Sequence, residues 1–256
     1  TGEVIKWGKV ASCAVGTVTY WGYGDESIST SQDDATNVWN ANYKAVWHWP
    51  DGTTLASLDS TAAANNGTIT GATAAAGQID GAANFNGSTQ YIEMANEANF
   101  DFERTNTCSF EMWVKAAATS PTTTQAMYAK QADAAGTDRG IVIVISGALA
   151  NDPYRFRLNS SSTSGLDVTY PRTNDTNWQH LVFTYSGSSL ASGVACYVNG
   201  AAQSQTILAN TLTTTLLNDT VVSVGYRKYT NSLHFAGSLD EMRVSSAEHA
   251  AAWAEA

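Results

Sequence analysis

The sequence carries little charge. Asp, Glu, Lys and Arg together make up 14% of its 256 residues, well below the share of about 25% in an average soluble protein. Acidic residues outnumber basic ones by 23 to 13, which gives a formal net charge of −10. A protein that binds a nucleic-acid backbone needs clusters of basic residues that displace counterions. The composition therefore argues against nucleic acid as a partner.

Long apolar runs and dense cysteine are also missing. No apolar stretch approaches the roughly 18 residues of a membrane-spanning helix, and the opening TGE lacks the basic start of a signal peptide. We therefore expect a soluble chain without a membrane span, trimmed at its start. The three cysteines, Cys13, Cys108 and Cys196, match no metal-binding spacing. Cys108 and Cys196 lie in apolar runs, which favours buried thiols over a disulfide.

The sequence is rich in short strand-like runs. Clusters of Gly, Asn, Asp, Ser and Thr separate these runs. Many alternate apolar and polar residues, as antiparallel strands do. The expected strands lie at 43–49, 66–71, 82–94 (two strands), 109–116, 126–131, 139–146, 154–159, 166–170, 178–186, 194–200, 221–226 and 234–245. About a dozen strands require two sheets, so we expect an all-β sandwich or jelly roll.

The chain divides near position 42, where the regular strand pattern begins. We expect residues 1–42 to form a partial N-terminal β segment with a polar connector, and residues 43–256 to form one jelly-roll domain. The tail SSAEHAAAWAEA predicts a short C-terminal helix, capped by Ser246 with Glu248 in its first turn. An open edge in the N-terminal segment would let it pair with neighbouring copies or domains by strand addition.

Alternation assigns the faces of two strands. In SFEMWVKA, Phe110, Met112 and Val114 share the core face, so Trp113 lies on the other face, either covered by a loop or exposed as a platform. In NWQHLVFTY, Trp178, His180, Val182 and Thr184 lie opposite Leu181, Phe183 and Tyr185 by the same rule. The following YVNG predicts a hairpin with a type I′ turn.

The stretch GSLDEMRVSS concentrates charge among apolar residues. Simple alternation puts Asp240 on the core-facing row with Met242 and Val244, and it puts Arg243 on the opposite row with Glu241. An ionised Asp at the end of a core-facing row needs a basic group, several N–H donors or a metal ion to offset its desolvation. Arg243 and Glu241 are expected to form a same-face ion pair.

Seven blocks fall in the order seen in laminin-G-like domains: AVWHWPDG, LDSTAAANNGTITGAT, GAANFNGSTQYIEM, SFEMWVKA, NWQHLVFTY, YVNG and GSLDEMRVS. Over about residues 43–256 the chain resembles a concanavalin A-like jelly-roll module of that superfamily. The preceding GTVTYWGYGDES is similar to the end of a small β domain of unknown function that often precedes such modules in large surface proteins. The resemblance implies two antiparallel sheets and an extracellular, cell-surface or virion-surface location. It also implies that Trp178 and His180 are scaffold residues.

The resemblance further implies a calcium ion between two distant blocks. The matching residues are Asp240 and Asp59, with a carbonyl from Asn65 or a neighbour. Calcium accepts 6 to 8 oxygen ligands and tolerates irregular geometry, so such a set suits it. The alternative is that Asp59 forms an Asx turn with Ser60 and that Asp240 accepts backbone N–H hydrogen bonds.

Aromatic and polar residues of one loop are candidates for binding a ligand. Sugars are recognised by aromatic rings that stack on their C–H faces and by polar groups that bond their hydroxyls. The segment GYRKYTNSLH supplies Tyr226, Arg227, Tyr229 and Asn231 between two strands. The alternative is that Tyr226 is an ordinary strand residue, because aromatic residues favour strands.

No catalytic motif is present. The alternating carboxylates with which related glycosidases flank a glycosidic bond are missing, and so is a G-x-S-x-G elbow. We therefore expect no catalytic residues and no enzyme activity. The sequence favours a calcium-stabilised recognition or adhesion module for glycans or surface proteins. The alternative is a structural subunit or decoration domain of an extracellular fibre, filament or virus particle.

Overall fold

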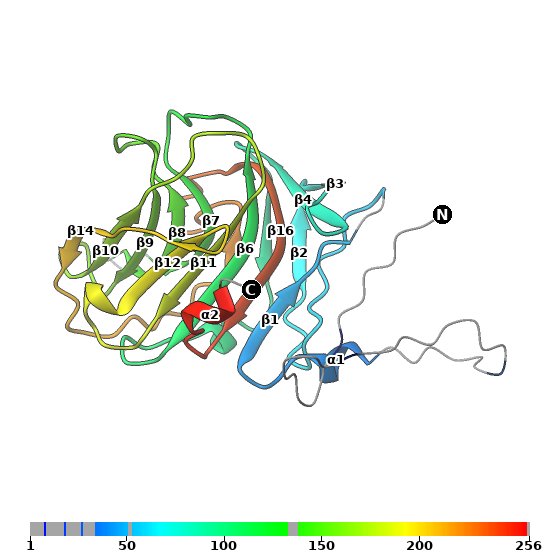
Figure 1. Ribbon diagram of the computed structural model, residues 1–256, viewed down its shortest axis with the longest axis horizontal. Helices are drawn as coiled ribbons and strands as arrows, with labels where there is room; N and C mark the ends of the chain where they lie inside the picture. Colours follow the sequence, from blue (N-terminus) through cyan, green and yellow to red (C-terminus); the bar gives the residue numbers. More distant parts are fainter. Residues whose placement is uncertain are drawn as a thin grey trace.

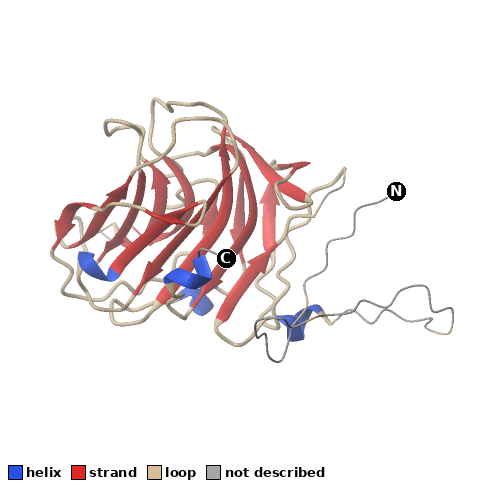
Figure 2. Ribbon diagram, in the orientation of Figure 1, coloured by secondary structure: helices blue, strands red, loops and turns tan. Residues whose placement is uncertain are grey.

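Two antiparallel sheets of eight strands each pack against one another (Figures 1 and 2). The computed structural model describes residues 34–50, 53–132 and 138–254, together with residues 8, 18 and 27. Most of the predicted N-terminal β segment therefore lies outside the described residues, as does Cys13. The two packed sheets confirm the predicted all-β jelly-roll sandwich.

Sheet I has the strand order β13-β12-β11-β6-β16-β4-β3, and β1 also pairs with β16. Its strands are β1 (Tyr43–Trp47), β3 (Thr73–Ala76), β4 (Gly81–Asn86), β6 (Cys108–Ala116), β11 (Gln179–Tyr185), β12 (Val194–Val198), β13 (Ala201–Ala202) and β16 (Ala236–Ser245). One side of β16 pairs with β6, while the other side pairs first with β4 and then with β1. The long strand β16 therefore holds three others.

Sheet II has the order β14-β10-β9-β8-β7-β15-β5-β2. Its strands are β2 (Gly67–Thr70), β5 (Tyr91–Met94), β7 (Gln125–Ala132), β8 (Arg139–Ile145), β9 (Tyr154–Asn159), β10 (Gly165–Tyr170), β14 (Thr206–Asn210) and β15 (Ser223–Val224). The helical turns are α1 (Ala35–Val38), η1 (Glu97–Phe100), η2 (Ala191–Gly193) and α2 (Ala251–Ala254). Among the described helices, none is long and apolar enough to span a bilayer.

The core between the sheets follows the predicted alternation. Phe110, Met112 and Val114 of β6 are buried in it, as are Leu181 and Phe183 of β11. The two cysteines within the described residues are free and buried, as expected from their apolar surroundings. The YVNG turn is also confirmed, because both of its central residues have positive φ angles.

The C-terminal helix begins later than predicted. It starts at Ala251 rather than directly after Ser246, and it is a single turn. Ser246 instead ties the end of β16 to the residue before β1, because its backbone N–H and its hydroxyl both donate to the carbonyl of Asn42, at 2.8 and 3.1 Å. The residue expected to cap a helix therefore fastens the start of β1.

A β-bulge in β16 overturns the predicted faces of GSLDEMRVSS. The register against β6 shifts between Asp240 and Arg243, and Glu241 adopts a φ of 48°. One extra residue reverses the faces of a strand. Leu239 before the bulge and Met242 after it both enter the core. Asp240 is therefore not in one row with Met242, as simple alternation had predicted.

The bulge assembles a buried charge network on the outer face of sheet I. The Arg243 guanidinium lies 3.0 Å from both carboxylate oxygens of Glu111 and 2.8 Å from Glu241. His48 approaches Glu241 at 2.6 Å, and His180 approaches Glu111 at 2.9 Å. Burial lowers the pKa of Arg243, but the two carboxylates outweigh that effect and raise it above its ordinary value. The predicted Arg243–Glu241 pair is thus present and buried.

Replacing Arg243 tests this network. Arg243→Met leaves two buried carboxylates without their shared cation, so we expect the free energy of unfolding to fall by about 3–5 kcal/mol. The measurement is urea unfolding followed by fluorescence. The triple variant with Glu111→Gln and Glu241→Gln should recover most of the loss. A triple variant as unstable as the single one would show that Arg243 acts by packing rather than by charge.

Candidate functional site

The outer face of sheet I has a covered half. The ring of Trp39 lies 5.3 Å from the Arg243 guanidinium carbon. Trp253 of α2 stacks on His249 with ring centroids 4.0 Å apart, and it packs against a cluster that includes Tyr197. Residues that precede β1 and residues that follow β16 therefore cover this half of the face.

The other half of this face carries two tryptophans, Trp113 and Trp178. Trp113 on β6 lies opposite His180 on β11, with ring centroids 5.0 Å apart. The amino group of Lys115 lies 5.9 Å from the ring centroid of Trp178. Both tryptophans are partly exposed, and no described residue accepts a hydrogen bond from either indole N–H. We call this set, Trp113, Lys115, Trp178 and His180, the tryptophan face.

The predicted ligand residues lie elsewhere, in a hairpin on the outer side of sheet II. Tyr226 is buried, stacks on Tyr91 with centroids 4.1 Å apart, and donates its hydroxyl to Glu93. Burial and that carboxylate raise the pKa of Tyr226 far above its ordinary value. The Tyr226 hydroxyl is therefore used within the protein. Asn231 is exposed at the tip of the hairpin with a φ of 45°.

Arg227 and Tyr229 of the hairpin contact one another. The guanidinium carbon of Arg227 lies 4.8 Å from the ring centroid of Tyr229, whose hydroxyl donates to Asp138. Arg227 also lies 3.5 Å from the side-chain oxygen of Gln131 on β7. The structure thus brings three of the four predicted residues onto one sheet face, where their polar groups bond mainly to the protein.

Further arginines lie next to this hairpin. On β9 and β10, Asp167 binds Arg155 through both carboxylate oxygens and lies 3.3 Å from Arg157. Burial lowers the pKa of Arg157, and the positive charges of Arg155 and Arg227 lower it further against the opposing effect of Asp167.

Asp59, a predicted calcium ligand, accepts hydrogen bonds from β1 and from its own loop. One carboxylate oxygen accepts the backbone N–H groups of Val46 and Thr61 at 3.0 and 2.9 Å. The other accepts the Thr61 hydroxyl and the Asn65 N–H, both at 2.8 Å. The carboxylate therefore holds its own loop in an Asx turn, as the alternative prediction proposed. It also accepts a hydrogen bond from the neighbouring strand β1.

The two other predicted calcium ligands are also engaged. The Asn65 carbonyl accepts the indole N–H of Trp47 at 2.9 Å. One Asp240 oxygen accepts the N–H groups of Gln78 and Ile79 at 2.9 and 2.8 Å, whereas Oδ1 is buried without a hydrogen bond. Burial, reinforced by Glu241, raises the pKa of Asp240 to about 7.

The predicted residues do not fit a shared calcium site. Asp59 and Asp240 bond to different segments, and only Oδ1 of Asp240 lacks a donor. Within the described parts of the chain, no group of three or more His, Cys, Asp or Glu side chains could hold a metal ion. The calcium site stays a prediction that these contacts do not support.

Most of the chain matches a protein-family model. A model described as the concanavalin A-like lectin/glucanases superfamily (Laminin_G_3) matches residues 86–253. The chain belongs to this superfamily. The match supports the resemblance given by the seven sequence blocks. A search of curated protein sequences finds no match.

Solved structures of binding domains share the fold. The binding domain of Paraclostridial mosquitocidal protein 1 is similar with a TM-score of 0.63 and 11% identity, over 87% of this chain and 52% of that one. The binding domain of botulinum neurotoxin serotype G gives 0.63 and 11%, over 84% and 50%. Domain 4 of AbnA, an extracellular arabinanase from Geobacillus stearothermophilus, was solved with arabinotriose and gives 0.57 and 20%, over 84% and 97%. The chain therefore spans about half the length of the toxin domains.

Asp59 provides a test of the calcium prediction. Asp59→Ala removes four hydrogen bonds, so we expect the free energy of unfolding to fall by about 3 kcal/mol, equally in calcium and in a chelator. Thermal melting in both solutions measures this, with Asp219→Ala at an exposed carboxylate as the control. Stabilisation of the wild type by calcium that is lost in both Asp59→Ala and Asp240→Ala would instead establish the shared ion.

Proposed function

We propose that this protein is a non-catalytic module that binds glycans through the tryptophan face. The observation that carries the proposal is the pair of partly exposed indole rings, Trp113 and Trp178, on the outer face of sheet I. Indole rings stack on the apolar faces of sugar rings and leave an N–H for a hydroxyl. A sheet face with two such rings suits a chain of sugars.

Polar side chains border the two rings. Lys115 projects beside Trp178, and the Asn84 amide lies across β16, where it donates to Ser238 at 2.9 Å. These groups offer hydrogen bonds beside the rings, whereas the rings offer apolar area. That combination of few polar groups around aromatic surface is typical of small-molecule and sugar sites. We propose an extracellular setting for this recognition, at a cell or particle surface, by analogy with the extracellular arabinanase that shares the fold.

The binding domains that share the fold support a binding role over a catalytic one. One of them was solved with arabinotriose and another with sialylT, and a third belongs to botulinum neurotoxin type C, whose cell entry depends on interaction with two ganglioside molecules. At such low sequence identities, these structures show only that this chain has the same fold. The glycan proposal therefore depends on the tryptophan face itself.

The hairpin on sheet II is a second candidate surface. Its supporting observation is that three arginines, Arg155, Arg157 and Arg227, share two carboxylates, those of Asp167 and Asp138. Such a surface would suit a partner protein with acidic side chains. The tryptophan face is preferred because the aromatic and polar groups of the hairpin already bond to one another.

The test begins with a glycan array of neutral plant and bacterial polysaccharides. For a glycan that binds, we expect Trp113→Ala and Trp178→Ala each to weaken affinity by about 30-fold, the size of an interface hot spot. Titration calorimetry gives the affinities. Trp253→Ala, on the covered half of the same sheet, is the matched control and should bind like the wild type.

Two results would reject the proposal. Binding that survives both tryptophan substitutions but is lost in Tyr229→Ala would move the site to the hairpin. Absence of any glycan ligand for the wild type would reject glycan recognition altogether. Incubation with the same polysaccharides should release no new reducing ends, and their appearance would show catalysis.

A further inference from the structure

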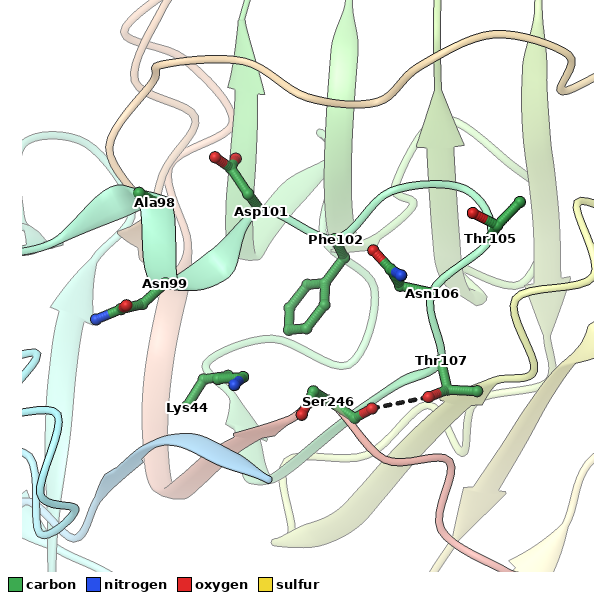
Figure 3. Close-up of a pocket in the computed structure, with 9 residues that line it drawn as sticks. All are labelled: Lys44, Ala98, Asn99, Asp101, Phe102, Thr105, Asn106, Thr107 and Ser246. Atoms are coloured by element: carbon green, nitrogen blue, oxygen red, sulfur yellow. Dashed lines mark hydrogen bonds between the residues drawn. The ribbon is translucent and has the colours of Figure 1, made fainter. Parts of the chain in front are cut away.

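A pocket of about 460 Å³ opens at the end of the sandwich where β1, the end of β16 and the loop before β6 meet (Figure 3). Lys44, Phe102, Asn106, Thr107 and Ser246 are among its lining residues. Its volume lies within the range of about 300–1,000 Å³ that ligand sites occupy. The site predictions from sequence named none of these residues.

The unpaired charge in this pocket is positive. The Lys44 side chain extends into it (Figure 3), and its amino group makes one long hydrogen bond of 3.5 Å to the carbonyl of Ala41. No described carboxylate forms an ion pair with Lys44. The carboxylate of Asp101 points away from the pocket centre and accepts a hydrogen bond from the buried Lys130 at 2.8 Å. An anion in the pocket would therefore meet Lys44 without facing a competing carboxylate.

The remaining polar groups are neutral. Asn106 accepts the N–H of Glu103 at 2.8 Å through Oδ1, which fixes its amide and leaves Nδ2 without a described acceptor. Thr107 donates to the Ser246 carbonyl at 2.7 Å, so that side of the pocket is held in place. The ring of Phe102 forms an apolar floor between them. A ligand with hydroxyls, one apolar face and one negative charge matches this set.

We propose that the pocket binds the carboxylate of an acidic sugar, such as a uronic acid residue, through Lys44. The ammonium group pairs with the carboxylate, the Asn106 amide donates to a ring hydroxyl, and the ring rests against Phe102. The pocket is separate from the tryptophan face. Thr107 directly precedes β6, and Trp113 lies six residues further along, which is about 20 Å of extended chain.

The experiment compares trigalacturonic acid with its neutral methyl ester by titration calorimetry at low and high salt. We expect the wild type to bind the acid at least tenfold more tightly, because hydrogen bonds to charged groups contribute more than neutral ones. Added salt should reduce that preference. Lys44→Met should abolish the preference, and Lys44→Arg, which keeps the charge, should retain most of it.

Lys228→Met is the matched control, because Lys228 is an exposed lysine that lies outside the pocket and the tryptophan face, where it pairs with Glu93. It should leave the preference for the acid intact. Equal binding of acid and ester by the wild type, or a preference that persists in Lys44→Met, would overturn the proposal. Neither result affects the binding of neutral glycans at the tryptophan face, so the two proposals fail separately.

Discussion

The bulge in β16 is the constraint on which the rest of sheet I depends. A single extra residue at Glu241 turns Met242 and Val244 into the core after Leu239, and it places Arg243 outside, within reach of Glu111. The buried ion pairs then need cover, which Trp39 supplies over Arg243, while α2 covers the neighbouring strands β11 and β12. The part of the face beyond that cover remains open, so the position of the bulge also determines where the tryptophan face lies.

Local patterns predicted the fold well. Alternation in β6 and β11 depends only on residues two apart, so the sequence was enough to assign their faces. The bulge could not be predicted in this way. A positive φ at a glutamate is unfavourable in isolation, and its offsetting contacts come from residues as distant as Glu111 and Gln78. The sequence shows the charges in β16 but not the partners that hold them.

The candidate sites also divide into features that the sequence could predict and features that it could not. The Asx turn at Asp59 uses donors within six residues, and the sequence had already offered it as an alternative to calcium. Trp113 was foreseen as a possible platform because alternation pointed it outward. By contrast, the pocket at Lys44 joins β1, the 97–107 loop and the end of β16. No spacing in the chain relates those segments, so only the folded structure reveals it.

The pairing of the start of β1 with the end of β16 has a mechanical consequence. β1 and β16 leave the sandwich side by side, with Tyr43 opposite Ser245 and the Asn42 carbonyl holding Ser246. Tension between residues 42 and 246 would act across this antiparallel pair, perpendicular to its strands, and would load its hydrogen bonds one after another. Strands loaded in this direction unzip rather than shear. The domain would therefore yield at low force when pulled through these two points, with β1 leaving first.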